Sequence, residues 1–188
     1  VTGYDFFTDG SQTIANNLAA KLPTGTLISD NWSANDVRCR LLGQAVGGLS
    51  GCAVPGVAAI NAHFTHYAGL SANGFTTSNF SDFVSSNEVA AAGGTSPTLN
   101  RRVVFSMGCH GGFNVPDRAS LPADPGIGID PALDFPQAMA RQRAIYIANT
   151  GYGLGEDPGL GYSEVLLARF SQELVKGVAG FEVVKEVL

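Results

Sequence analysis

The chain has 188 residues, which suits one domain with a sizeable core. Hydrophobic residues make up 45% and charged residues only 14%, which excludes an intrinsically disordered chain. Eleven basic and sixteen acidic residues give a formal net charge of −5, which is unfavourable for binding nucleic acid. No apolar run approaches about 18 residues, the length that marks a membrane-spanning helix. We therefore expect neither a nucleic-acid partner nor a membrane span.

Short apolar runs alternate with amphipathic stretches, which is typical of an α/β domain with a mostly parallel sheet flanked by helices. The apolar runs predict strands at residues 1–4, 26–29, 57–62, 103–107 and 144–148. The third run, VAAINA, is apolar at nearly every position, so we expect both of its faces to be covered.

Helices are expected between these runs. Residues 11–22 form the first, with Ser11 as its cap and Ile14, Leu18 and Leu22 on one face. Ser33-Ala-Asn-Asp36 resembles a capping box and opens a helix through Leu42, in a region that ends at Gly47 and Gly48.

The second half of the chain contains two further predicted helices. One starts at Asp134-Phe-Pro136, because proline suits the first helical turn and aspartate its positive end. The last helix covers 163–176, with Leu166, Phe170 and Leu174 on one face, and stops at Gly177.

Two long segments have weaker patterns. Residues 67–100 are polar and rich in Gly, Ser and Thr, with a short helix expected at about 80–84. Residues 111–133 are rich in Pro, Gly and Asp and are too long for an idle connection. Neither a repeat nor a dividing linker is visible, so we expect one domain. The opening VTGYDFF has no features of a signal peptide, and we expect the domain to be excised from a longer polypeptide.

Three cysteines exclude a dense disulfide scaffold and leave at least one thiol free. Cys39 and Cys52 either pair, if the protein is exported, or remain two buried thiols.

Reactive side chains directly follow two of the predicted strands. His63 follows VAAINA, and Cys109 follows VVFSMG. In an open parallel sheet, catalytic groups collect at the carboxyl ends of strands, and neighbouring strands lie about 4.8 Å apart. An imidazole at that range can activate a thiol as a nucleophile. His63 precedes Cys109 by 46 positions, close to the caspase spacing of about 50.

Two other interpretations compete with this one. Cys109 and the histidines can be buried structural side chains, since cysteine is commonly buried. Three histidines and a cysteine can also bind a metal, but the spacing of HFTH and the later Cys-His matches no zinc pattern. The clustering of reactive residues at strand ends favours a catalytic site.

The segments VVFSMGCHGGFNVPD, LDFPQAMARQRAIYIANTGYGLGEDP and YSEVLLARFSQEL, together with NAHFTH, resemble the gingipain-type cysteine peptidases of the caspase–hemoglobinase clan. The resemblance covers nearly the whole chain and is most specific from Val103 to Gly155. It implies a caspase-like three-layer domain that cleaves peptide bonds through a Cys–His dyad and a thioester. The resemblance implies no required cofactor and allows a structural calcium ion.

Carried over residue by residue, the resemblance makes Cys109 the nucleophile and His63 the catalytic histidine. The backbone N–H groups of Cys109 and Phe64 would receive the oxyanion. Residues Asn149, Thr150 and Tyr152 would border the substrate cleft. The chain departs from the family pattern at Ala62 and Phe64, which stand where glycines are usual, and in its closing segment GFEVVKEVL.

The remaining candidates concern the choice of histidine and the substrate. His66 is the alternative catalytic histidine, although His63 follows the strand more directly, and His110 is expected to point away from the site. Met107, two positions before the nucleophile, cannot pair with a cation. Asp5 would then be the pocket acid that selects a basic P1 side chain, or it merely caps a turn.

Two functions follow. The first is a cysteine endopeptidase that acts on peptides or proteins and leans towards basic P1 residues. The alternative is a catalytically silent caspase-like binding or scaffolding module of a larger protein, and a metal-binding α/β domain is a third, weaker interpretation. The compartment stays open, with an extracellular or cell-surface location favoured.

Overall fold

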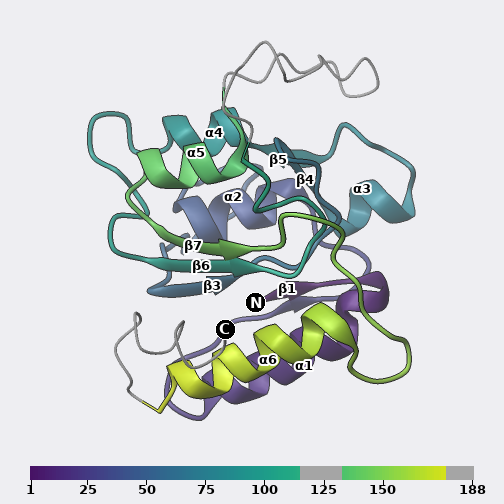
Figure 1. Cartoon of the computed structure of the whole chain (residues 1–188). Coiled ribbons are helices and arrows are strands. Elements are labelled where there is room, and N and C mark those ends of the chain that lie inside the picture. The colour runs from purple at the N-terminus through teal and green to yellow at the C-terminus, as the bar shows by residue number, and fades with distance from the viewer. Residues whose placement is uncertain (115–132, 177–188) are drawn as a thin grey trace.

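Short parallel strands form the centre of the molecule (Figure 1). The computed structural model describes residues 1–114 and 133–176. The central strands are β1 (Thr2–Gly3), β2 (Leu27–Ile28), β3 (Val57–Ala59), β6 (Val103–Ser106) and β7 (Ile145–Ala148). β1 pairs with β2, and β6 pairs with both β3 and β7, always in parallel. A parallel bridge between Thr2 and Ile60 places β1 beside the end of β3, which gives the order β2-β1-β3-β6-β7.

Helices cover both faces of these strands (Figure 1). One layer contains α1 (Thr8–Ala19) and α6 (Tyr162–Leu174), and the other contains α2 (Ala34–Leu42), α4 (Ser86–Ala91) and α5 (Phe135–Arg141). This arrangement confirms the predicted α/β class. Among the described residues, none of the helices has the length and apolar character that crossing a membrane requires.

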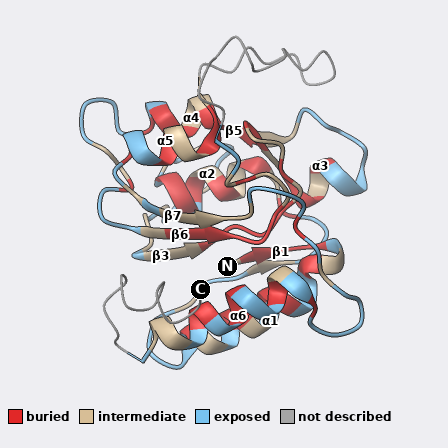
Figure 2. Cartoon of the chain, in the orientation of Figure 1, coloured by how far each residue is buried: buried red, intermediate tan, exposed pale blue. Residues whose placement is uncertain are grey.

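The sequence of β6 explains why both faces are covered. Val104 and Phe105 are neighbours in a strand, so their side chains point to opposite faces, and both are 0% exposed. Val104 lies in a core with residues of α2 and α5, whereas Phe105 packs with Ile14 of α1 and Phe170 of α6. Figure 2 shows buried residues concentrated in the strands and on the inner sides of the helices.

Side-chain caps set the beginnings of several helices. Ser33 and Asp36 form the predicted capping box of α2, and Asp134 forms another with Gln137 at the start of α5. Each box satisfies backbone N–H groups that the helix itself leaves without partners. α2 ends at Leu42, as predicted, and the left-handed backbone of Gly43 caps it. Gly47 and Gly48 lie in the loop beyond, also with positive φ.

The first helix begins earlier than predicted. α1 starts at Thr8, directly after the 3-10 turn η1 (Asp5–Phe7), so Ser11 lies inside the helix and is not its cap. Ser11 is 0% exposed and accepts a hydrogen bond from Asn61 Nδ2 at 3.0 Å. Burial of Phe7 fixes this early start, because the aromatic ring belongs to the core beneath the sheet.

The prediction of a helix at 80–84 is wrong. β4 (Ala68–Leu70) and β5 (Phe83–Ser85) form an antiparallel pair there, with α3 (Ala72–Thr76) between them. Val84 is 5% exposed and packs in the core with α2, and this long-range contact decides the conformation. The polar composition around it hid the strand.

The last helix buries a different face from the predicted one. Leu166 is 40% exposed, while Glu164, Leu167 and Ser171 are buried, in the i, i+3, i+7 spacing of one helical face. Phe170 is buried as predicted. Gly177 and most of the segment 111–133 lie outside the described residues.

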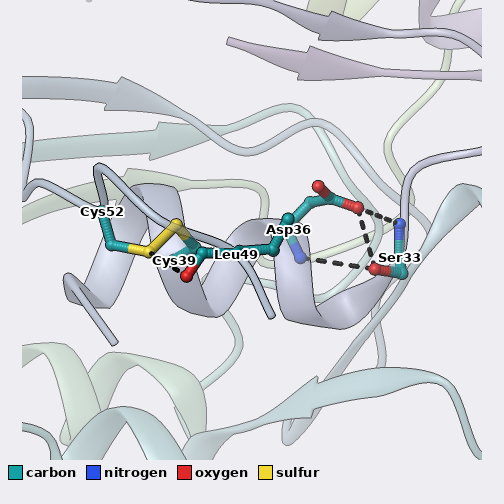
Figure 3. The surroundings of a disulfide bond; sticks show 5 residues. All are labelled: Ser33, Asp36, Cys39, Leu49 and Cys52. Atoms are coloured by element: carbon teal, nitrogen blue, oxygen red, sulfur yellow. Dashed lines mark hydrogen bonds between the residues drawn. A yellow bond between two sulfur atoms is a disulfide. The ribbon is translucent and has the colours of Figure 1, made fainter. Parts of the chain in front are cut away.

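Cys39 and Cys52 form a disulfide, with 4.7 Å between their Cα atoms (Figure 3). It ties the middle of α2 to the loop that precedes β3. This settles the alternative left open by the sequence. Cys109 is the only free thiol among residues 1–114 and 133–176.

Candidate active site

The predicted dyad residues lie at matching positions in the strand register. Val57 of β3 pairs with Val103 of β6, a difference of 46 positions, and 46 positions also separate His63 from Cys109. Extending this register beyond the ends of β3 and β6 therefore places His63 and Cys109 opposite each other, in one row across the sheet. Gly108 packs so closely against Ala62 and Phe64, the neighbours of His63, that a Cβ at position 108 would overlap the Ala62 carbonyl. The loop that contains Cys109 and the loop that contains His63 therefore pack against each other.

Asp5 binds His63 at the place where the strand order reverses. Asp5 follows β1 and His63 follows β3, which are neighbours on either side of the reversal, a common site for ligands in open α/β sheets. Asp5 Oδ2 lies 3.0 Å from His63 Nε2. The side chains are 40% and 28% exposed, so the pair is partly screened by solvent. A carboxylate in this position orients the imidazole.

Aromatic side chains contact both the backbone and the imidazole ring of His63. Tyr4 is 0% exposed; its hydroxyl accepts the His63 backbone N–H at 3.1 Å and donates to the Leu70 carbonyl at 2.9 Å. Burial raises the pKa of Tyr4 above its ordinary value, so this hydroxyl stays protonated and keeps its donor role. Phe75 stacks on the imidazole with 4.5 Å between ring centroids. The ring of His63 is therefore restricted on several sides.

The thiol of Cys109 lies against the loop that follows β7. Gly153 N–H donates to Cys109 Sγ at 3.3 Å, and the thiol lies 3.5 Å from the Gly153 carbonyl, which can accept its proton. The backbone of Gly153 can therefore bind the thiol through its carbonyl and the thiolate through its N–H. A Cβ at position 153 would overlap the Met107 carbonyl, so only glycine permits this approach. Cys109 itself is half-buried.

Two backbone N–H groups of the candidate site remain available as hydrogen-bond donors. The N–H groups of Cys109 and Phe64 have no hydrogen-bond acceptor within residues 1–114 and 133–176. His110 next to Cys109 has a φ of 54°, and its own N–H is used by the Gly151 carbonyl at 2.7 Å. Such left-handed backbone at a non-glycine residue often marks a functional turn.

The other predicted residues are distributed unevenly around the site. Met107 is 0% exposed, so its side chain belongs to the core and lines neither hollow at the site. Asn149 donates to the Met107 carbonyl at 2.8 Å. The Thr150 carbonyl lies 3.4 Å from His110 Nδ1, and Tyr152 is 73% exposed beside the His110 ring. His110 thus points away from Asp5 and His63, towards the loop after β7.

Two hollows flank Phe64. The larger, about 450 Å³, is lined by aromatic side chains such as Tyr67 and Phe113, together with His66 and His110. The smaller, about 160 Å³, lies beside His63 and is lined by apolar side chains such as Leu70 and Phe83. No carboxylate is among the described residues that line either hollow. Another cavity of about 450 Å³ lies at the amino ends of the strands and contains none of the candidate residues.

Sequence reasoning missed Asn61 and Tyr4. Asn61 is 0% exposed and lies two positions before His63. A polar residue that interrupts the apolar run VAAINA just before a histidine is a signal that could have identified it. Tyr4 gives no such signal, because it contacts His63 only through the placement of β1 beside β3, which are far apart in the sequence.

Comparison of the chain with family models, with curated proteins and with solved structures found no match. The site is therefore interpreted from its own geometry. Within the described parts of the chain, no three His, Cys, Asp or Glu side chains lie close enough together to hold a metal ion.

Proposed function

We propose that the protein is a cysteine endopeptidase with a caspase-like fold, related to the gingipain-type peptidases. The observation that carries this proposal is the Asp5–His63 contact of 3.0 Å in a row shared with Cys109 at the carboxyl ends of parallel strands. A thiol, an oriented imidazole and two backbone N–H groups without acceptors are the parts that acyl transfer needs. Helices on both faces of a parallel sheet, in the order β2-β1-β3-β6-β7, support the caspase-like fold.

In the proposed reaction, the Cys109 thiolate attacks the scissile carbonyl carbon. The carbonyl oxygen becomes an oxyanion, which accepts hydrogen bonds from the N–H groups of Cys109 and Phe64. The tetrahedral intermediate collapses with cleavage of the C–N bond, and protonated His63 gives its proton to the leaving amine. Water then attacks the thioester, His63 takes up its proton, and the carboxylic acid product leaves Cys109 as it was.

A catalytically silent binding or scaffolding module is the alternative, and one labelling reaction separates the two. A peptidyl acyloxymethyl ketone alkylates a catalytic thiolate with loss of its carboxylate. We expect one adduct, mapped by mass spectrometry to the peptide that contains Cys109, at a rate far above that of a free thiol with the same reagent. Labelling no faster than that of free cysteine would support the silent module.

A peptide or protein is the proposed substrate, with no nucleic acid involved. The Cys39–Cys52 disulfide supports an oxidising compartment, as expected for an extracellular or cell-surface protein.

The substrate's P1 side chain is expected to be apolar or aromatic. The basic preference inferred from the sequence depended on Asp5, and Asp5 is hydrogen-bonded to His63. Because no carboxylate lines the described parts of the two hollows, a buried Lys or Arg side chain would be left without a partner. In a positional peptide library, we expect kcat/KM for Phe or Leu to exceed that for Arg by about tenfold or more.

Two variants identify the hollow that receives the P1 side chain. Phe113→Ala opens the larger hollow and Phe80→Ala the smaller, and both phenylalanines are exposed by about half, at 44% and 53%. The variant that broadens the P1 profile identifies the subsite. A dominant preference for Arg or Lys would contradict this assignment.

Loss of the Asp5 charge should slow catalysis without unfolding the protein. Asp5→Asn preserves the shape but gives His63 Nε2 a neutral amide in place of a carboxylate, so we expect kcat to fall by about ten- to a hundredfold. Asp9→Asn is the matched control, because Asp9 lies one turn further along and binds the Gly159 N–H at 2.9 Å, with no contact to His63. Equal kcat values for the two variants would remove Asp5 from the catalytic arrangement.

A further inference from the structure

A row of side-chain amides continues the sheet beyond the point where its backbone ladder ends. The last paired residues are Ala59 with Phe105, and Ser106 with Ala148. Extending the same register places Asn61, Met107 and Asn149 side by side. The following row, two positions on, contains His63 and Cys109. The amide row thus lies one row before the candidate dyad.

Both amides bind the peptide groups of Met107. Met107 N–H donates to Asn61 Oδ1 at 3.3 Å, and Asn149 Nδ2 donates to the Met107 carbonyl at 2.8 Å. These two contacts take the place of ladder hydrogen bonds beyond the last paired residues.

Each amide is also tied to a helix on the same face of the sheet. Asn61 Nδ2 donates to Ser11 Oγ of α1 at 3.0 Å, and Asn149 Nδ2 lies 3.2 Å from Ser163 Oγ of α6. Asn61 and Met107 are 0% exposed, so water cannot substitute for these partners. The helices thus hold the amides, and the amides hold the backbone two residues before Cys109.

We propose that Asn61 and Asn149 are positioning residues that fix Cys109 Sγ relative to His63 and the oxyanion N–H groups. This inference rests on the proposed peptidase function. The physical reason is that acyl transfer tolerates little error in placement, since a displacement of about 1 Å can reduce a rate by about a hundredfold. Asn61 couples the loop of His63 to that of Cys109, and Asn149 couples the loop of Gly153 to the same residue, Met107.

Asn149→Asp is the decisive variant, because aspartate has the same shape but no side-chain N–H to donate. Asn17→Asp is its matched control: Asn17 Nδ2 also donates to one backbone carbonyl, that of Ala168 at 2.9 Å, and to one serine hydroxyl, Ser171 Oγ at 3.0 Å. Asn17 joins α1 to α6 and contacts no residue of the site. Any general loss of stability caused by replacing asparagine with aspartate should therefore appear in both variants.

We expect Asn149→Asp to lower kcat by about tenfold or more while KM changes by less than about threefold. In Asn17→Asp, kcat should stay within about twofold of the wild type, even where the thermal midpoint falls equally in both variants. If the asparagines had only a structural role, kcat would fall in proportion to the fall in thermal midpoint in both variants. That result, or an unchanged kcat in Asn149→Asp, would overturn the proposal.

Alkylation of Cys109 by iodoacetamide separates this inference from the proposed function. The rate is measured for the wild type, for His63→Ala, and for each asparagine variant with and without His63→Ala. Positioning predicts that the effect of His63→Ala on the rate is lost in Asn149→Asp and retained in Asn17→Asp. If the wild type cleaves no peptide, the proposed function fails, while this double-mutant comparison still decides whether the amides hold Cys109 and His63 together. An effect of His63→Ala that is the same in both backgrounds would refute positioning.

Discussion

Replacing Cys109 with alanine is expected to abolish peptide cleavage while leaving the fold intact. The thioester cannot form without Sγ, so the loss should reach the detection limit, at least about a thousandfold in kcat. Cys109 is half-buried, and its contacts with Gly153 involve only the sulfur, so its removal leaves no large cavity. The thermal midpoint should therefore change little. Cleavage of a fluorogenic peptide and thermal unfolding of the same preparation measure both effects.

The remaining cysteines provide the control for this prediction. Cys39 and Cys52 are joined in a disulfide and do not compete for a thiol reagent. We expect one equivalent of iodoacetamide to react with the native wild type and none with Cys109→Ala among the described residues. Retained cleavage in Cys109→Ala would remove the nucleophile assignment, and with it the proposed mechanism.

The overall fold could be predicted largely from local patterns. The run VVFS is apolar on both faces, and such a run is stable only between two layers of helices, as Val104 and Phe105 show. The capping boxes at Ser33 and Asp134 fix two helix starts, because a side-chain cap acts within three residues. Features that depend on neighbours close in the chain are therefore present in the sequence.

Features that depend on distant contacts could not be predicted in this way. β5 pairs with β4 across a helix, and the pattern of residues 67–100 contains no alternation strong enough to reveal it. The buried face of α6 starts at Glu164, whose carboxylate accepts the N–H groups of Glu156 and Gly161. A buried carboxylate held by a local loop is invisible to a rule that counts only apolar residues.

The candidate site was partly visible in the spacing of its residues. The interval of 46 positions between His63 and Cys109 equals the register between β3 and β6, so a spacing in the sequence corresponds to a row in the sheet. The contact between Asp5 and His63 joins residues 58 positions apart across the reversal of strand order. Hydrophobic periodicity contains no information about that crossing.

The second large effect distinguishes the two histidines of the HFTH segment. His63→Ala should lower kcat by at least about a hundredfold, the usual contribution of a positioned acid or base. His66→Ala should lower it by less than about tenfold. His63 lies in the row of Cys109 with Asp5 at 3.0 Å, whereas the His66 ring packs edge-on against Tyr67, with 4.6 Å between ring centroids.

His66 also has a structural task, which makes a comparison of stability necessary. Its backbone carbonyl accepts the N–H of Phe135 at 2.7 Å and so joins the loop after β3 to the start of α5. This contact does not involve the side chain and survives in His66→Ala, so a modest loss of activity should come with a modified P1 profile, because His66 lines the larger hollow. If His66→Ala instead causes the larger fall in kcat and His63→Ala the smaller, the acid that protonates the leaving amine is His66. The contact between Asp5 and His63 would then have only a structural role at the ends of the strands.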